Sequence, residues 1–425
     1  MLDMRMIRER ADEVRAGAAL KRIPVDIDRL LALDERRRQL MRGAEEGKAE
    51  QKRRSKAVGA LSPEARAAEL SSLGELKARL VTEEAELAAV AAEWEALMLR
   101  VPNIPAPEVP PGRDDTENVE VRRVGEVPDR GFPLLDHVEL GRRLGIIDIE
   151  RGVRISGSRF YVLLGAGALL HRAVLSLALE HMVKKGFVPM EVPVLVRDPA
   201  MVGTAYFPGG EEQAYRLERD ELNLVGTAEV PLTSFRAGEI LDPAELPLRY
   251  VAQSVCFRRE AGAAGKDTRG LYRIHQFQKV EQVVVLPADP DASREMHASI
   301  VRNAEEVLEL LGLPYRVVNV CGGDLGLSQV QKFDIETWMP SRGGYGETHS
   351  ASRFHDFQAR RLNLRYRDAR GDTRFCHTLN NTVIASPRIL IPILEMCQQK
   401  DGSVRVPEAL APWMGGREVL EPVTA

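Results

Sequence analysis

A heptad pattern runs through residues 26–100, and it requires long packed helices there. The stretch is rich in Ala, Glu, Leu, Lys and Arg and contains a single proline, Pro63. In the second half its apolar residues recur at alternating spacings of three and four, with one gap at Glu83. The first half repeats the spacing, but Arg37, Gly47, Gln51 and Arg54 occupy its other seam positions. Such spacing is typical of a seam between helices. The seam residues are Leu30, Leu33, Leu40, Ala44, Val58 and Leu61 in the first half, and Leu73, Leu76, Leu80, Leu87, Val90, Trp94 and Leu97 in the second.

The two halves are joined by Gly59-Ala-Leu-Ser62-Pro63, which combines a helix stop, a serine cap and a proline suited to the first helical position. We therefore expect two antiparallel helices of about 35 residues, or about 50 Å, each. Three glycines inside them each cost about 1 kcal/mol, so we expect a bendable arm near its tip. These glycines are Gly43, Gly47 and Gly74.

The charge pattern of the first helix suggests a partner. Nine basic residues and three acids lie between positions 36 and 56, whereas a solvated helix face usually mixes signs more evenly. Dimerisation or spacing is the ordinary use of such helices, and contact with an RNA backbone is the alternative. The basic residues are Arg36, Arg37, Arg38, Arg42, Lys48, Lys52, Arg53, Arg54 and Lys56.

The whole chain resembles a cytoplasmic protein. Its 425 residues carry a net charge of −4, so any nucleic-acid surface must be local. The longest apolar stretch, residues 160–170, is too short to span a bilayer, and the charged start lacks a signal-peptide core. Four scattered cysteines indicate a reducing compartment and argue against a structural zinc site. They are Cys256, Cys321, Cys376 and Cys397.

A proline-rich segment divides the chain. Residues 101–112 hold five prolines and form a stiff linker. Beyond residue 115, short β-branched strands alternate irregularly with helices, without the regular βαβ order of a parallel sheet. We therefore expect an α+β fold with domains at 1–100, 101–114 and 115–425, the last built on a mostly antiparallel sheet flanked by helices. The expected elements include a strand at 186–196 and helices at 169–185, 293–311 and 388–399.

Two extended runs between residues 257 and 281 combine the groups that a nucleotide site needs. Arg258 and Glu260 are two positions apart, on one face if the first run is a strand. Arg273, Phe277 and Glu281 recur at intervals of four and share a face in the second run. Together they can hold a phosphate, stack on a base and bind an amine or hydroxyl. The P-loop, the dinucleotide glycine pattern and His-Glu-x-x-His are all missing from the sequence.

The order of this motif among other clusters carries more information than any cluster does alone. Taken singly, an Arg-x-Glu is usually a surface pair, and a threonine such as Thr382 can be a helix cap. In sequence order they closely resemble the seryl-tRNA synthetases, a family of class II aminoacyl-tRNA synthetases. The matching motifs are Thr-Ala-Glu at 227–229, Phe-Arg-x-Glu-Ala-Gly at 257–262, His-Gln-Phe-x-Lys-Val-Glu at 275–281, Asp-Phe-Gln-Ala-Arg-Arg at 356–361, and Thr-Leu-Asn at 378–380 followed by Arg388.

The resemblance covers essentially the whole chain and implies a class II core behind a helical arm. Residues 187–196, 257–281 and 380–395 correspond to the three class II motifs. The implied reaction is activation of L-serine by ATP to seryl-adenylate, followed by transfer to tRNA(Ser), and to tRNA(Sec) where that tRNA is present. Mg²⁺ is the implied cofactor, with no zinc.

The resemblance also assigns residues. It implies Arg258, Arg388 and Glu347 as catalytic, and Glu347 with Ser350 as the Mg²⁺ ligands. The implied ATP site is Arg258, Arg259, Glu260, Arg273, Ile274, Phe277, Glu347, Thr348, His349, Ser350 and Arg388. The implied serine site is Thr227, Ala228, Glu229, Arg258, Glu281, Asn380 and Thr382.

In this family the helical arm reads the long variable arm of serine tRNAs by shape and backbone contact, which suits the basic residues at 36–56. The arm of one subunit serves the active site of the other. The resemblance therefore implies a homodimer with its interface near the first class II motif.

Some positions depart from the usual family pattern. His349 and Arg353 replace a serine and an asparagine, Asn381-Thr382 replaces Gly-Ser, and Pro387 replaces a glycine. We expect Arg353 to add a cation beside the site. A specialised or inhibitor-resistant paralogue, a ligase that loads serine onto a carrier protein and a non-catalytic RNA-binding protein remain alternatives.

Overall fold

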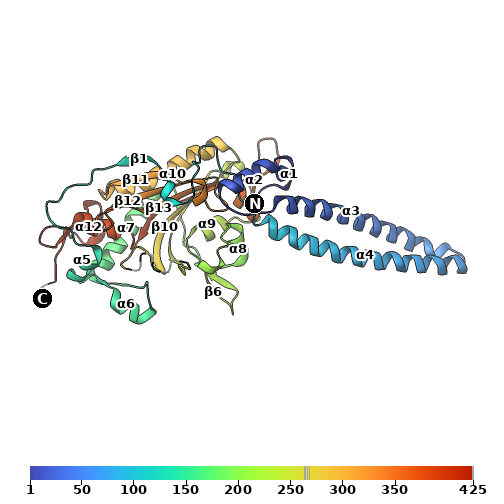
Figure 1. Ribbon diagram of the computed structural model, residues 1–425, viewed down its shortest axis with the longest axis horizontal. Helices are drawn as coiled ribbons and strands as arrows, with labels where there is room; N and C mark the ends of the chain where they lie inside the picture. Colours follow the sequence, from blue (N-terminus) through green and yellow to red (C-terminus); the bar gives the residue numbers. More distant parts are fainter. Residues whose placement is uncertain (263–264, 266, 268, 424–425) are drawn as a thin grey trace. The chain divides into compact units, whose positions relative to one another are not determined.

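The structure is a computed structural model that describes residues 1–262, 265, 267 and 269–423. It contains two compact units (Figure 1). The first comprises Met1–Ala19 and Ile23–Pro102, and the second comprises Leu20–Arg22 and Asn103–Ala425. Each unit has its own architecture, built from different sequence patterns.

The first unit is helical. Its long helices α3 and α4 run antiparallel over 31 and 36 residues (Figure 1). Ser62 caps α4 by accepting a hydrogen bond from the Ala65 amide, and Pro63 occupies the first turn. The capping signal in the sequence therefore marks a real helix start. The helices are α1 (Met4–Glu9), α2 (Ala11–Leu20), α3 (Ile27–Ala57) and α4 (Pro63–Met98).

The expected seam is buried along much of its length, at Leu30, Leu33 and Leu40 on α3 and at Leu76 and Leu80 on α4. One predicted weakness proves to be a packing requirement. A Cβ added at Gly47 would lie 2.6 Å from the Leu80 Cδ2 atom, so the glycine permits close approach of the two helices. A Cβ at Gly74 would meet nothing within 4 Å. A Cβ at Gly43 would make only an ordinary contact, with the Glu83 Oε2 atom at 3.8 Å, so Gly43 and Gly74 act mainly through helix propensity.

The second unit is built on an eight-stranded sheet in the order β1-β11-β12-β13-β16-β10-β9-β4. Every neighbouring pair is antiparallel except β4 with β9. This confirms the expected α+β class with a mostly antiparallel sheet. The strands are β1 (Val119–Val124), β11 (Tyr315–Asn319), β12 (Gln331–Met339), β13 (Gly344–His355), β16 (His377–Ser386), β10 (Gln276–Leu286), β9 (Leu248–Phe257) and β4 (Val188–Pro189).

Helices α7 (Gly165–Lys184) and α10 (Pro290–Leu310) cover one face of this sheet and close the main hydrophobic core. Alternate residues of the central strands, such as Val280, Val284 and Val383, enter that core. The other face carries the shorter elements. The remaining helices are α5 (His137–Arg143), α6 (Ile149–Ser156), α8 (Asp198–Gly203), α9 (Glu229–Ser234), α11 (Phe357–Leu362) and α12 (Leu390–Cys397).

Small sheets complete the unit. They consist of β2 (Ile147–Asp148) with β3 (Val162–Leu163); β5 (Leu195–Arg197), β7 (Leu222–Leu224) and β6 (Tyr215–Leu217); β15 (Thr373–Phe375), β14 (Arg365–Arg367) and β8 (Ile240–Leu241); and β17 (Val404–Arg405) with β18 (Val419–Leu420). Short 3-10 helices are η1 (Val58–Ala60), η2 (Asp115–Glu117), η3 (Glu211–Gln213), η4 (Pro243–Glu245), η5 (Gly322–Asp324), η6 (Pro340–Arg342) and η7 (Glu408–Met414).

Two expected strands differ from those observed. The run at 186–196 is divided into β4 and β5, because Pro189 and Pro193 cannot donate to a continuous ladder. The run ending at Glu260 stops three residues earlier, at Phe257, and Glu260 adopts a left-handed backbone with φ of 53°. The prediction that Arg258 and Glu260 share a strand face is therefore wrong.

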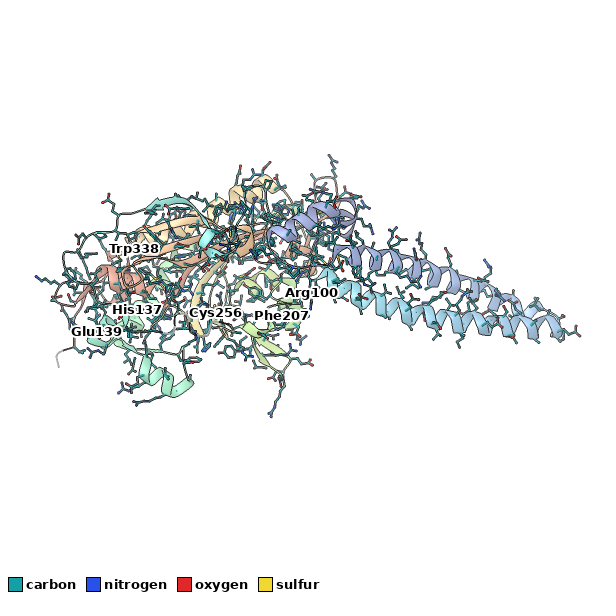
Figure 2. The ribbon with its side chains drawn as sticks, viewed as in Figure 1. Arg100, His137, Glu139, Phe207, Cys256 and Trp338 are labelled. Carbon is teal, nitrogen blue, oxygen red and sulfur yellow. The ribbon has the colours of Figure 1, made fainter. Side chains whose placement is uncertain are left out.

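The four cysteines are free thiols, and Cys256 lies buried within strand β9 (Figure 2). Across the described ranges, no helix combines the length and hydrophobicity that a bilayer crossing requires.

Candidate active site

A cavity of about 330 Å³ opens on the sheet face opposite helices α7 and α10. The central strands β10, β13 and β16 supply its floor, because alternate side chains of each strand point the same way. The floor residues are Phe277, Lys279 and Glu281 of β10, Ser350, Ser352 and Phe354 of β13, and Asn380 and Thr382 of β16. The face of these strands that lines the cavity is therefore largely polar, whereas their reverse face is largely apolar.

The end of strand β9 brings Arg258 into the cavity. Its guanidinium lies 5.2 Å from the centre of the Phe277 ring, and its Nε atom donates to the Gly226 carbonyl oxygen at 3.4 Å. The His275 carbonyl accepts from the Arg258 amide at 2.9 Å, which ties the arginine to the start of β10. A fixed cation and an aromatic ring thus stand together at this end of the cavity.

Arg273 lies in an adjoining cavity of about 430 Å³ that shares Arg258 and Glu260 with the first. Its Nη1 atom lies 2.7 Å from the Glu260 Oε2 atom. Its Nε atom lies 3.6 Å from the Asp267 Oδ2 atom. The two cavities therefore form one polar region, with Arg273 held by carboxylates at its rim.

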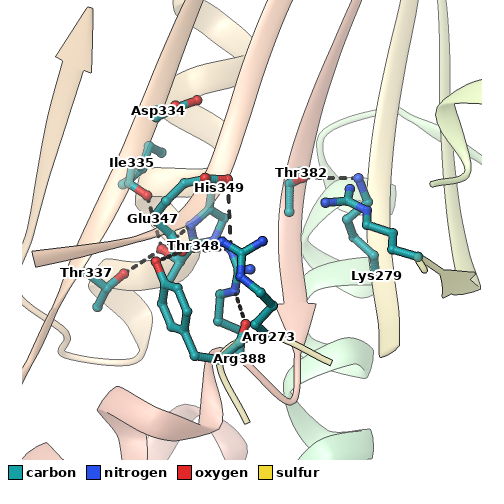
Figure 3. A network of polar contacts seen from close by, with 12 residues as sticks. Arg273, Lys279, Asp334, Ile335, Thr337, Glu347, Thr348, His349, Thr382 and Arg388 are labelled. Atoms are coloured by element: carbon teal, nitrogen blue, oxygen red, sulfur yellow. Dashed lines mark hydrogen bonds and ion pairs between the residues drawn. The ribbon is translucent and has the colours of Figure 1, made fainter. Parts of the chain in front are cut away.

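Arg388 and Glu347 face each other near the same region (Figure 3). Arg388 donates through Nε to the Tyr272 carbonyl and through Nη1 to the Glu347 carbonyl, both at 3.0 Å. The Glu347 side chain is half exposed to the cavity. Desolvation acts to raise the pKa of its carboxyl, but the charges of Arg388 and Lys332 outweigh it, so the pKa is lowered. Glu347 is thus held as an anion.

Oxygen donors for a cation are present at this position. The Glu347 carboxylate and the Ser350 hydroxyl both line the cavity. Mg²⁺ in nucleotide enzymes is commonly held by one or two protein oxygens together with phosphate oxygens and water, so this pair fits it. Within the described part of the chain, no three His, Cys, Asp or Glu side chains converge in a metal-binding group.

A buried charge pair lies at the other end of the cavity. The Lys279 Nζ atom lies 2.5 Å from the Glu281 Oε2 atom, and both side chains are almost fully enclosed. The Thr382 hydroxyl donates to the same carboxylate at 3.3 Å. Burial raises the pKa of Glu281, against the opposing effect of Lys279. Lys279 belongs to the motif at 275–281 but is not among the expected site residues, although its position two residues before Glu281 places it on the same strand face.

Glu229 adds a second buried carboxylate at this end. Its Oε2 atom accepts from the Tyr206 hydroxyl and its Oε1 atom from the Gln358 amide, both at 2.8 Å. Burial, reinforced by the charge of Glu281, raises the pKa of Glu229 to about 7. Neither residue is among the expected site residues: Gln358 lies within the motif at 356–361, and Tyr206 comes from a loop distant in sequence.

Most of the predicted site residues meet in these cavities. The first cavity is lined by Arg258, Glu260, Ile274, Phe277, Glu347, Thr348, Ser350 and Arg388 of the implied ATP site, and by Glu229, Glu281, Asn380 and Thr382 of the implied serine site. Arg273 lines the second. The side chains of Thr227, Ala228, Arg259 and His349 line neither.

His349 and Arg353 point away from the cavity, because they alternate with Ser350, Ser352 and Phe354 along β13. His349 is buried, its Nδ1 atom lies 2.8 Å from the Thr348 hydroxyl, and burial lowers its pKa to about 3. The Arg353 guanidinium donates to the Glu108 carboxylate at 2.5 Å. The expectation that Arg353 adds a cation beside the site is therefore wrong.

The nine basic residues of α3 fall into two groups. Five are ion-paired within the first unit: Arg36 with Glu86, Arg37 with Asp34, Arg38 with Glu35, Lys48 with Glu84, and Arg54 with Glu50 and Glu69. Within the described residues, the other four have no ion pair and are exposed. These are Arg42, Lys52, Arg53 and Lys56.

Both parts of the chain match described families. Residues 1–105 match the seryl-tRNA synthetase N-terminal domain, and residues 215–397 match the tRNA synthetase class II core domain (G, H, P, S and T). A serine--tRNA ligase of Deinococcus radiodurans is 48% identical over 420 residues, covering 99% of each chain. A serine--tRNA ligase of Thermobifida fusca is 46% identical, covering 100% of this chain and 99% of its own.

Solved structures agree with these matches. The seryl-tRNA synthetase of Pyrococcus horikoshii complexed with ATP has a TM-score of 0.91 and is 37% identical, with 100% of each chain covered. The cytoplasmic serine-tRNA ligase of Naegleria fowleri in complex with AMP has a TM-score of 0.87 and is 31% identical, with 100% of this chain and 99% of the other covered.

Proposed function

The chain belongs to the seryl-tRNA synthetase family, and we propose that the cavity on its antiparallel sheet is where L-serine and ATP form seryl-adenylate. The observation that carries this assignment is the convergence of Arg258, Glu281, Glu347 and Arg388 in one polar region from separate elements of the fold. Two cations at one end and buried carboxylates at the other suit a triphosphate beside an amino acid.

ATP occupies the end that contains Arg258 and Arg388. Phe277 stacks on the adenine, since its ring lines the cavity beside the Arg258 guanidinium. The Glu260 carboxylate accepts from the adenine amino group, and Arg273, held by Glu260, lies on the phosphate side. Arg388 binds the distal phosphates, because its backbone hydrogen bonds fix its guanidinium beside Glu347.

The chemical step joins two anions. The serine carboxylate attacks the α-phosphorus, and pyrophosphate leaves. Arg258 stabilises the charge on the pentavalent transition state, so catalysis rests on positioning and electrostatics and needs no side-chain nucleophile. Glu347 and Ser350 would hold Mg²⁺, which would supply further neutralisation of the phosphates.

Serine occupies the other end. When Glu229 is ionised, above its pKa of about 7, the carboxylates of Glu229 and Glu281 outnumber the single ammonium group of Lys279, which leaves a net negative charge for the serine ammonium. The side-chain hydroxyl of serine bonds to Glu281 and Thr382, with Asn380 beside them. Alanine would leave these buried groups without a partner, which disfavours its binding.

The helical arm provides the tRNA contact. We infer that residues 1–100 bind the long variable arm of tRNA(Ser), that residues 101–114 connect this arm to the catalytic core at 115–425, and that the core forms a cytoplasmic homodimer. The unpaired cations Arg42, Lys52, Arg53 and Lys56 are the better phosphate ligands, because the other five already hold carboxylates of the same unit. The match of residues 1–105 to a synthetase N-terminal domain counts against a carrier-protein ligase.

Two measurements test the proposal. Serine-dependent exchange of pyrophosphate into ATP, compared with threonine, alanine and cysteine, is expected to favour serine. Charging of tRNA(Ser), compared with loading of a carrier protein, is expected to favour the tRNA. Preference for an unrelated amino acid would refute the assignment of the cavity.

A further inference from the structure

The buried amino group of Lys21 bonds to three backbone carbonyls. Only 2% of the surface of Lys21 is exposed. The Nζ atom donates to the carbonyl oxygens of Gly326 at 3.0 Å, Leu327 at 3.1 Å and Gln329 at 2.5 Å. An ammonium group has three donors, so the three carbonyls match it in number. Burial lowers the pKa of Lys21 well below its usual value, so these contacts offset a large desolvation cost.

Asn103, which follows the helical arm in the sequence, binds the same loop of residues 326–329. Its amide donates to the Leu327 carbonyl at 2.8 Å. Its Nδ2 atom donates to the carbonyls of Ser328 at 2.9 Å and Phe354 at 2.7 Å. The four successive carbonyls of residues 326–329 are therefore all bound by two residues, one of them 305 positions away in sequence from Gly326.

The 326–329 loop is a wall of the active-site cavity, since all four of its residues line it. Gln329 donates through Nε2 to the Ser352 hydroxyl at 2.8 Å and accepts from the Gly326 amide at 2.6 Å. Ser352 pairs with Asn380 across strands β13 and β16. Asn380 lies two residues from Thr382 on the same face, so the loop borders the amino-acid end. Glu347 lies near the start of β13 and Arg388 lies just beyond the end of β16, where the phosphates are proposed to bind.

The chain crosses between the two units at these same residues. Leu20–Arg22 belongs to the second unit, although the residues on both sides belong to the first, and Asn103 is the residue at which the chain returns to the second unit. Entry into and exit from the helical arm are thus both bonded to one loop of the cavity.

We propose that Lys21 and Asn103 are positioning residues that set the 326–329 wall at the amino-acid end of the cavity, so that the two chain crossings of the arm determine the affinity for serine. This inference rests on the proposed function. The side chains act through backbone carbonyls and do not touch the reacting atoms. Their loss displaces a wall of the serine site while Arg258 and Arg388 keep their own hydrogen bonds.

The test uses the full-length chain with Lys21→Met and, separately, Asn103→Asp. Lys21→Met keeps an unbranched side chain and removes all three donors. Asn103→Asp keeps the side-chain shape and removes the Nδ2 donors, while the backbone N–H of residue 103 remains. Pyrophosphate exchange is measured while serine and ATP are varied in turn. We expect KM for serine to rise about tenfold, with KM for ATP changed less than about twofold and kcat largely retained, the pattern of lost ground-state binding.

Asn303→Ala is the matched control. Asn303 lies on α10, is similarly buried and donates to the Gln282 side chain at 2.9 Å, on the opposite sheet face. It is expected to lower stability without changing KM for serine. Gln329→Ala, which cuts the bond to Ser352, keeps the proposal testable if Lys21→Met does not fold, and is expected to raise KM for serine as well.

Folded variants with unchanged KM for serine would overturn the inference, as would equal increases in KM for serine and ATP. The wild-type chain separates this failure from failure of the proposed function. If the wild type shows no serine-dependent exchange, the assignment of the cavity is wrong. If it shows normal exchange and the variants match it, only the role of Lys21 and Asn103 is refuted.

Discussion

The buried pair of Lys279 and Glu281 allows stability and substrate recognition to be separated in one experiment. The two charges lie 2.5 Å apart in a nearly enclosed site. Removing one partner of such a pair leaves an uncompensated buried charge and typically costs about 3–5 kcal/mol. Lys279→Met is therefore expected to destabilise the catalytic unit by about that amount, which lowers its folding equilibrium constant by more than about 100-fold.

The double variant Lys279→Met with Glu281→Gln removes both charges together. We expect it to recover most of the lost stability, because no buried charge remains unpaired. Serine activation is not expected to recover, since the carboxylate that binds the substrate is missing. Urea unfolding followed by circular dichroism measures the first quantity, and serine-dependent pyrophosphate exchange measures the second.

Two results would refute this reasoning. If Lys279→Met is as stable as the wild type, the pair does not stabilise the unit through a desolvated contact. If the double variant activates serine normally, Glu281 does not bind the substrate. Val285→Ala, a truncation on the same strand within a separate apolar cluster, serves as the control for destabilisation without loss of a charge.

Four other outcomes are expected. Arg258→Ala should reduce pyrophosphate exchange by about 100-fold or more, because the transition state loses a fixed cation, and near-normal exchange would remove Arg258 from that role. Lys52→Gln should weaken tRNA binding and reduce the slope of log K against log salt concentration by about one. Lys48→Gln should change both quantities much less, because Lys48 is already paired with Glu84. KM for serine should rise as the pH falls from 8 to 6, because protonation of Glu229, whose pKa is about 7, removes negative charge from the ammonium site; Glu229→Gln should lack that dependence. Chelation of Mg²⁺ by EDTA should stop exchange, and activity that survives it would exclude a cation at Glu347 and Ser350.

Local periodicity in the sequence determined several features of this protein. The three–four spacing and the Ser62-Pro63 cap predict the paired helices α3 and α4, because helix geometry and capping depend on neighbouring residues alone. The two-residue period of β10 likewise places Phe277 and Glu281 on one face. The order of the motifs along the chain sufficed to indicate the family.

Only the tertiary structure decided which basic side chains are free of ion pairs. It also decided whether the residues that depart from the family pattern point into the cavity or away from it. Arg36 is neutralised by Glu86, fifty residues away on the facing helix, and Arg353 turns to Glu108 instead of the cavity. Contacts of this kind depend on chain segments brought together by folding, and neither partner's local sequence specifies the other. The same is true of Lys21, whose three carbonyl partners become visible only once the 326–329 loop is in place.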